Sequence, residues 1–270
     1  MHLNVIKSNT SALYPDVTPS SLESTPIINT ENGFLNDDVS FLISSFTIYS
    51  FSSVCIIFVS VSILKKVFLN FKELFFFYGR IGDTMVVDFD KFLLNPKWII
   101  GYSDVTALHA KLQSMNCESL HATMPINFSD NTETSLKSFY EALTKGCLTY
   151  EIDNAPINIK GEAQGELVGG NISVLYSLLG SSSFPNTDGK ILFLEDLDEY
   201  LYHIDRMMMA FKRAGKLDNI KGLIVGALTK MHDNTIPFGK DAEQIIFEYV
   251  KNKGIPVCFN FPAGHIDDNR

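Results

Sequence analysis

The segment that most constrains the fold of this chain is KWIIGYSDVTALH, residues 97–109. Its apolar residues Trp98–Ile100 lead to Gly101, the chain turns over Ser103, and a helical pattern follows. A short strand, a sharp turn and a helix in this order are typical of an α/β protein, and they present the serine hydroxyl at the edge of a sheet. Gly101 allows a tight turn because it has no Cβ to clash. The segment predicts a strand-turn-helix with Ser103 as a candidate nucleophile.

Two roles fit Ser103. As a nucleophile, it would precede a helix N-terminus whose backbone N–H groups and partial positive charge can hold an oxyanion. The glycine that usually stands two residues after such a serine is replaced by Val105. In the alternative, Ser103 or Asp104 only caps the helix. The turn alone does not choose between the two roles.

The composition narrows the class of protein. The 270 residues are 46% hydrophobic and 20% charged, which indicates a folded chain of one large or two modest domains. The net charge of −9 argues against a nucleic-acid partner, because no basic stripe can neutralise phosphates. Four scattered cysteines form no Cys-x-x-Cys pair, so we expect neither a zinc site nor a disulfide framework, but reduced thiols in a cytosolic protein: Cys55, Cys117, Cys147 and Cys258.

The first part of the chain lacks the sequence pattern of a globular domain. Residues 1–38 are polar and rich in Ser, Thr, Asn and Pro, and are expected to form a flexible arm. Residues 39–64 contain no charge and are long enough for a membrane helix. Lys65 and Lys66 follow, so the rest of such a chain would lie in the cytoplasm. Buried strands, a degenerate region or a translation artefact are the alternatives for this segment.

The second part alternates short apolar runs with helical patterns, which predicts an α/β fold. We expect a nucleophile lobe at residues 79–150, a linker at 151–160 and a C-terminal lobe at 161–270. The expected strands are residues 98–100, 161–168, 190–194, 222–226 and 256–260. The expected helices are residues 104–114, 136–143, 171–179, 200–214 and 241–251.

Serine hydrolysis also needs a base and an acid that orients the base. His265 follows the last expected strand in a Pro-Ala-Gly-His loop, where catalytic groups commonly lie. Glu195 and Asp196 end the apolar run Ile191–Leu194, at the carboxyl edge of an expected central strand. Spacing alone does not choose Glu195 over Glu199. Among the other histidines, packing or surface roles are expected for His109 and His203, and the roles of His121 and His232 stay open.

Several segments together resemble the LD-carboxypeptidases, a family of serine peptidases that includes muramoyltetrapeptide carboxypeptidase and the microcin C immunity peptidases. The resemblance covers about residues 87–270. It implies an N-terminal α/β lobe that carries the serine and a smaller C-terminal lobe that carries a glutamate and a histidine. The site would lie between the lobes, usually in a homodimer. The segments that carry it are residues 98–109, 120–125, 165–171, 192–206 and 261–269.

The resemblance also implies residue roles and a substrate. The triad would be Ser103, Glu195 and His265, and the enzyme would release the terminal D-alanine of murein tetrapeptide in the cytoplasm without a metal or organic cofactor. The backbone N–H of Asp104 would be the first oxyanion donor. The remaining candidates are Gly82 for the second donor, and Gly169, Gly170 and Asn171 for substrate contacts. Lys230, Arg206 and the N-terminus of the Asn171 helix could bind the substrate carboxylate.

The chain departs from the family pattern at both ends. The family's glycine loop has only Gly79 and Gly82 as counterparts, and its first strands are not recognisable in residues 1–78. The chain ends at Arg270, soon after His265, which predicts an unpaired and mobile His-bearing strand. Three interpretations remain. One is an active enzyme with a divergent or membrane-tethered N-terminus, another a non-catalytic remnant, and the third an immunity peptidase acting on a peptidyl-nucleotide.

Overall fold

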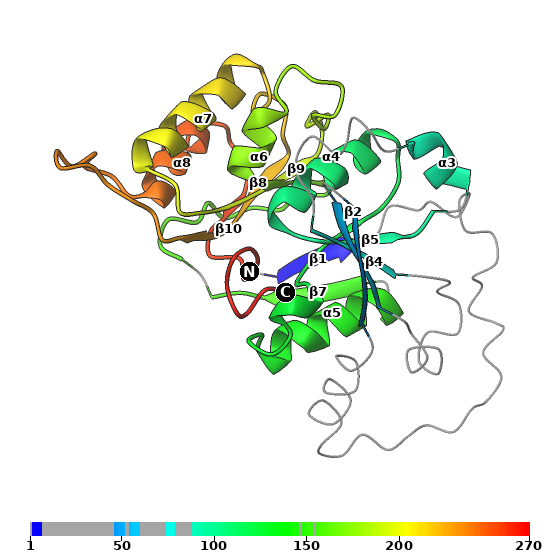
Figure 1. Cartoon of the computed structure of the whole chain (residues 1–270). Helices are drawn as coiled ribbons and strands as arrows, with labels where there is room; N and C mark the ends of the chain where they lie inside the picture. The colour runs from blue at the N-terminus through cyan, green and yellow to red at the C-terminus, as the bar shows by residue number, and fades with distance from the viewer. Residues whose placement is uncertain are drawn as a thin grey trace.

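The computed structural model describes residues 88–94, 96–145, 147–153 and 155–270, together with the backbone of four strands before them. These strands are β1 (His2–Ile6), β2 (Phe46–Phe51), β3 (Val54–Val59) and β4 (Leu74–Tyr78). The described elements form two lobes, each built around its own sheet, and a short ribbon beside them (Figure 1).

The sheet of the N-terminal lobe has five strands in the order β2-β3-β4-β5-β6. Its last strands are β5 (Trp98–Gly101) and β6 (Leu120–His121). Strands β2, β3 and β4 pair antiparallel, whereas β4, β5 and β6 pair parallel. Because β5 lies between the parallel strands β4 and β6, the turn that follows it emerges at the carboxyl edge of these three strands, where α/β proteins place their ligands.

Helices cover both faces of β5. Ile99 packs with Leu108 and Leu112 beside α3 (Phe89–Leu94) and α4 (Thr106–Ser114). Ile100 packs with Leu143 of α5 (Glu133–Lys145) on the opposite face. Successive side chains of a strand point to opposite faces, so the uninterrupted apolar run of β5 suits a strand buried on both sides.

The sheet of the C-terminal lobe is fully parallel, in the order β11-β10-β9-β8. Its strands are β8 (Leu167–Asn171), β9 (Ile191–Leu197), β10 (Gly222–Thr229) and β11 (Val257–Cys258). One face is covered by α6 (Ile172–Ser177), α7 (Leu201–Arg213) and α8 (Ala242–Val250), which share a large apolar core with the strands (Figure 1). A capping box between Asp241 and Gln244 starts α8.

The opposite face of this sheet is covered by the end of the chain. Phe193 and Ile224 pack there against Phe261 and Ala263, with Tyr150 beside them. Tyr150 belongs to β7 (Cys147–Glu151), which pairs antiparallel with β1 to form the ribbon. Ala107 and Ala110 of α4 pack against Val174 of α6 and thereby join the two lobes.

The structure confirms the predicted α/β class and moves several boundaries. The strand expected at residues 161–168 begins only at Leu167, and the preceding residues 161–166 are exposed and have no regular secondary structure. Glu195 and Asp196 lie inside β9 rather than after it. The ladder to β8 still pairs Asn171 with Glu195, and the ladder to β10 extends to Thr229.

The N-terminal segments differ from the sequence-based expectations. In the stretch 39–64, the described residues form β2 and β3, which pair with each other, so the strand alternative fits and the membrane helix is not supported. Its β-branched and aromatic side chains favour strands. Among the described residues, none of the helices has the length and apolar character needed to cross a membrane. His2–Ile6, expected in the flexible arm, forms β1, and residues 7–38 lie outside the described residues.

Candidate active site

The turn after β5 has the strained geometry expected of a nucleophile elbow. Ser103 has a φ of 60°, a left-handed conformation that costs an L-residue roughly 1–2 kcal/mol. Such strain persists mainly where surrounding structure enforces a functional conformation. A Cβ on Gly101 would lie 2.8 Å from Cγ2 of Val105. The valine therefore packs directly on the glycine, and the close approach explains why residue 101 must lack a side chain.

His109 of α4 holds the first half of this turn. Its Nε2 lies 3.0 Å from the carbonyl oxygen of Gly101, and its Nδ1 lies 2.7 Å from Oγ of Ser119. Burial lowers the pKa of His109 to about 3, so the ring is neutral. A neutral ring has one N–H, which Nε2 must donate to the carbonyl while Nδ1 accepts from the serine hydroxyl. His109 is thus a packing residue, as expected, with a further role in fixing the elbow.

Glu195 and His265 form a direct pair in the C-terminal lobe. Oε2 of Glu195 lies 2.8 Å from Nδ1 of His265, and the Glu195 side chain is fully buried. Gly264 makes the pair possible, because a Cβ there would lie 2.7 Å from Oε2 of Glu195. Its φ of 115° also favours glycine. The carboxylate must accept the Nδ1–H, which leaves Nε2 of His265 as the basic nitrogen.

The segment that carries His265 is a loop tied by hydrogen bonds, not the unpaired strand that was expected. The Gly264 N–H donates to Oδ1 of Asn269 at 2.9 Å. The carbonyl of Asn269 in turn accepts from Oγ of Ser135, at 2.6 Å, at the start of α5. The Asn131 amide donates to the carbonyl of Asp267 at 2.9 Å. Backbone bonds to β10 and side-chain bonds to the N-terminal lobe together therefore hold this loop in place.

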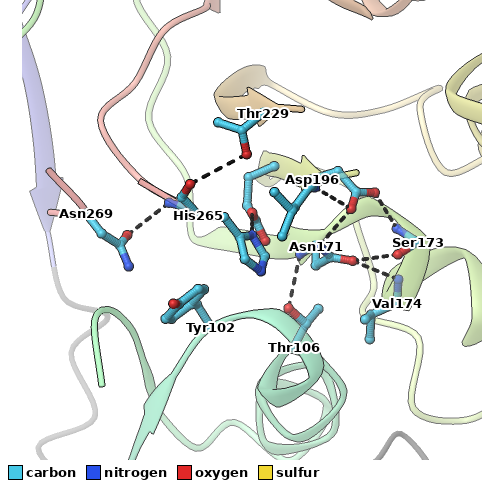
Figure 2. Close-up of polar contacts among 12 residues, drawn as sticks. Tyr102, Thr106, Asn171, Ser173, Val174, Asp196, Thr229, His265 and Asn269 are labelled. Carbon is cyan, nitrogen blue, oxygen red and sulfur yellow. Dashed lines mark hydrogen bonds and ion pairs between the residues drawn. The ribbon is translucent and has the colours of Figure 1, made fainter. Parts of the chain in front are cut away.

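The two halves of the candidate triad come together between the lobes. The ring of Tyr102, next to Ser103 in the chain, meets the ring of His265 edge-on with centroids 4.9 Å apart (Figure 2). In the described part of the chain, no hydrogen bond joins Ser103 to His265. The structure thus brings Glu195 and His265 into direct contact and positions the Ser103 turn beside them.

The electrostatics of Glu195 favour its ionised form. Burial acts to raise the pKa of this carboxyl, but the imidazoles of His121 and His265 outweigh burial and bring the pKa down to about 2. A permanently ionised carboxylate beside Nδ1 of His265 stabilises the imidazolium that forms when Nε2 takes a proton. The arrangement can therefore support general base catalysis.

A second buried carboxyl, Asp196, lies beside the contact between the lobes. It accepts hydrogen bonds from the Asn171 amide at 2.9 Å and from the N–H groups of Ser173 and Leu197 at 3.0 and 2.8 Å. The N–H of Asn171 donates to Oγ1 of Thr106 in α4, at 3.0 Å (Figure 2). Burial raises the pKa of Asp196 to about 7, and the charge of Glu195 adds to the rise, while the three donors oppose it.

The three residues expected to contact substrate have packing roles in the structure. A Cβ on Gly169 would lie 1.9 Å from the carbonyl oxygen of Phe193, and one on Gly170 would lie 2.5 Å from Oγ1 of Thr106. The Asn171 side chain caps α6 by accepting from the N–H of Val174. With Asp196 on the N–H of Ser173, the N-terminus of α6 already holds a carboxylate of the protein itself. Their contacts with substrate stay a prediction.

The remaining candidates lie apart or outside the described residues. Asp104 follows Ser103 in a short 3-10 turn (Ser103–Val105), and Gly82 lies outside the described residues. His203 pairs with Glu199 at 2.9 Å, and the half-exposed His232 with Asp198 at 2.6 Å, both as solvent-accessible pairs. This pairing separates Glu199 from His265 and leaves Glu195 as the acid. The described residues hold no group of three or more His, Cys, Asp or Glu that could bind a metal ion.

The structure adds one residue that sequence reasoning left open. Nε2 of His121, at the end of β6, lies 3.8 Å from Oε1 of Glu195. Both ring nitrogens of His121 are buried, and within the described residues neither has a hydrogen-bond partner. The position of His121 at a strand end, on the same edge as the elbow, was the available signal.

Two family models match the chain. Residues 79–122 match the LD-carboxypeptidase N-terminal domain, and residues 164–270 match the LD-carboxypeptidase C-terminal domain. The second match contains Glu195 and His265, and the first contains Ser103 and His121. The order and spacing of both matches agree with the two lobes of the fold.

Named relatives and a solved structure point to the same family. The chain is 34% identical over 197 residues to a probable murein peptide carboxypeptidase of Bacillus subtilis, covering 69% of this chain and 60% of that protein. It is 26% identical over 215 residues to the microcin C7 self-immunity protein MccF of Escherichia coli, covering 66% of this chain and 61% of that protein. The crystal structure of muramoyltetrapeptide carboxypeptidase from Oxalobacter formigenes superposes with a TM-score of 0.59 at 26% identity, covering 68% and 64% of the two chains. The chain thus spans about 60% of the length of these curated relatives.

Proposed function

The chain belongs to the LD-carboxypeptidase family, and on that premise we propose that it is a serine-type LD-carboxypeptidase that releases the terminal D-alanine of murein tetrapeptide. One observation carries the proposal. The buried Glu195–His265 pair, joined at 2.8 Å, lies beside the left-handed turn that carries Ser103. A nucleophile in a strained turn, a base and an orienting acid are the parts of a serine hydrolase.

Each residue has one task in the proposed reaction. Ser103 Oγ attacks the amide carbonyl before the terminal D-alanine, and Nε2 of His265 takes the serine proton. Glu195 keeps the proton of His265 on Nδ1 and stabilises the imidazolium. His265 then donates the proton to the leaving amine, and water releases the acyl group from Ser103 by the same steps in reverse order. The backbone N–H of Asp104 is the proposed first oxyanion donor, with Gly82 as the candidate for the second.

The proposed setting follows from the substrate. Murein peptide is the proposed partner, met in the cytoplasm, and a second copy of this chain is the proposed oligomeric partner. The similarity to MccF supports a second candidate substrate, a peptidyl-nucleotide cleaved at its amide by the same three side chains. Cleavage of either substrate needs a serine nucleophile, so the two candidate functions require different binding pockets but the same triad.

The proposal is tested with purified protein and murein tetrapeptide. We expect D-alanine release by the wild type and a loss of at least about 10³-fold in Ser103→Ala. Ser114→Ala is the matched control, because Ser114 ends the helix that follows Ser103 and its hydroxyl donates to the carbonyl of Lys111. A fluorophosphonate probe should label the wild type and the control but not Ser103→Ala.

Three results would change the proposal. Equal release by the wild type and Ser103→Ala would exclude the serine mechanism. Cleavage of a peptidyl-nucleotide, with none of the tetrapeptide, would replace the substrate. A folded wild type that cleaves neither compound and takes no fluorophosphonate would identify a non-catalytic remnant.

A further inference from the structure

The carboxylate of Glu195 is satisfied on one side only. Its Oε2 accepts the hydrogen bond of His265, whereas Oε1 is buried and has no hydrogen-bond partner among the described residues. An ionised oxygen without a partner in a buried site is costly, because desolvation is not repaid. The imidazole of His121 faces this oxygen, and its Nε2 lies 3.8 Å away.

His121 is unsatisfied as well. Both of its ring nitrogens are buried, and neither has a partner within the described residues. Its ring meets the edge of Phe193 at 5.0 Å between centroids, and the rings of His109 and Tyr102 lie at 6.0 and 6.4 Å. Burial keeps His109 neutral, so Glu195 is the charged group that faces His121 from the elements packed around it.

The distance between Nε2 of His121 and Oε1 of Glu195 leaves a direct hydrogen bond as the way to satisfy both atoms. A separation of 3.8 Å is too long for a hydrogen bond. It is also too short for a bridging water, since two hydrogen bonds of about 2.8 Å at a tetrahedral oxygen span about 4.6 Å. An approach of about 1 Å would make the direct bond at the usual length of a charge-assisted contact.

The two atoms belong to different lobes. His121 ends β6 of the N-terminal sheet, and Glu195 lies in β9 of the C-terminal sheet. We propose that His121 is a positioning residue of the proposed reaction: an approach of about 1 Å between the lobes, with or without substrate, lets its Nε2–H bind Oε1 of Glu195 and fix the carboxylate that orients His265. The inference rests on the proposed function, and it assigns to His121 the link between the spacing of the lobes and the alignment of the base.

A packing histidine and a positioning histidine respond differently to substitution. His121→Leu keeps the volume and removes the donor, whereas His121→Gln keeps an N–H at a similar reach. If His121 positions Glu195, the leucine variant should lose about 10²-fold in kcat with little change in KM, and the glutamine variant should recover most of the loss. His232→Gln is the control, because it alters another histidine–carboxylate pair that is exposed.

The second readout is the basicity of His265. Without a donor on Oε1, Glu195 directs its full charge at His265, so the His265 imidazolium is stabilised. The acid limb of the pH profile of kcat/KM should therefore move to higher pH in His121→Leu, and NMR titration of the His265 ring should show the same rise. Equal kcat in the leucine and glutamine variants, with an unchanged His265 titration, would overturn the proposal.

The experiment separates this inference from the proposed function. If the wild type releases no D-alanine, the proposed function fails, while the NMR titration of His265 in the variants still decides the role of His121. If His121→Leu does not fold, His121→Asn takes its place, because the asparagine amide is too short to reach Oε1. The comparison of glutamine with asparagine then supports the proposal when only glutamine preserves kcat and the titration, and overturns it when both behave alike.

Discussion

The two lobes hold their functional side chains in opposite ways. In the C-terminal lobe, Glu195 and His265 are already joined at 2.8 Å, and Gly264 makes room for the contact. In the N-terminal lobe, Ser103 is held by a strained backbone without a bond to His265, and Nε2 of His121 lies 3.8 Å from Oε1 of Glu195, too far for a hydrogen bond. The difference shows that the acid–base pair is already formed within one lobe. The position of Ser103 relative to this pair, in contrast, depends on the distance between the lobes.

The largest effect is expected from a substitution that disrupts the C-terminal sheet, which holds Glu195 close to His265. Gly169→Ala places a Cβ 1.9 Å from the carbonyl oxygen of Phe193 in the neighbouring strand, so β8 and β9 cannot pair at that point. We expect no cooperative unfolding transition in thermal or urea denaturation. Gly180→Ala is the control, because its φ is also positive and no atom lies within 4 Å of the added Cβ. A stable Gly169→Ala protein would show that the close pairing of β8 and β9 at this position is not required for the fold.

The next largest effect is expected from a substitution that keeps the fold intact but moves Glu195 and His265 apart. Gly264→Ala places a Cβ 2.7 Å from Oε2 of Glu195, so the carboxylate or His265 must move. A displacement of about 1 Å at a catalytic group typically costs about 10²-fold in rate, and we expect that loss in D-alanine release. Gly254→Ala, with a φ of 69° and open space around the Cβ, measures the backbone strain alone. Equal activity of the two variants would show that the pair is not preformed.

The pH dependence of stability tests the charge of the pair. The pKa of Glu195 is lowered to about 2, below its ordinary value of 4.5, so its contribution to stability is present above pH 4.5 and is lost as the pH falls toward 2. In urea unfolding, the wild type should therefore exceed Glu195→Gln in stability at pH 5, and the gap should narrow between pH 4.5 and 2. A gap that stays constant over this range would mean that the histidines do not stabilise the carboxylate.

The smallest expected effect concerns the contact between the lobes. Thr106→Val keeps the shape of a fully buried side chain but removes the oxygen that accepts the Asn171 N–H. A buried donor left without a partner costs about 1–3 kcal/mol, which should appear in the free energy of unfolding. Thr106→Ser keeps the hydroxyl and should lose less in hydrogen bonding. If the Thr106→Val variant is as stable as the Thr106→Ser variant, the hydrogen bond between the lobes does not contribute to the free energy of unfolding.

Sequence reasoning located the candidate residues but not the contacts among them. The elbow was predictable because a strand, a glycine and a helical pattern surround Ser103 within 13 residues. The choice of Glu195 over Glu199 came from the family resemblance, and its physical reason appears only in the structure. Glu195 is buried in a strand paired on both sides, whereas Glu199 lies beyond it and bonds His203.

Long-range contacts and ambiguous segments set the limit of prediction. The bond of Asn171 to Thr106 spans 65 residues, and that of His265 to Glu195 spans 70, so no local pattern encodes either. Periodicity could not decide residues 39–64, because an uninterrupted apolar run suits a helix as well as buried strands. The packing of Gly169 and Gly170 likewise depends on neighbours that a single sequence does not place.

The loop that presents His265 is also the fastening between the lobes. Its last residues bind Asn131 and Ser135 beside α5, while its first residues pack on the C-terminal sheet. The same ten residues, 261–270, therefore carry the proposed base and also bind one lobe to the other. A substitution that loosens this segment would therefore weaken the contact between the lobes and displace the proposed base in a single step.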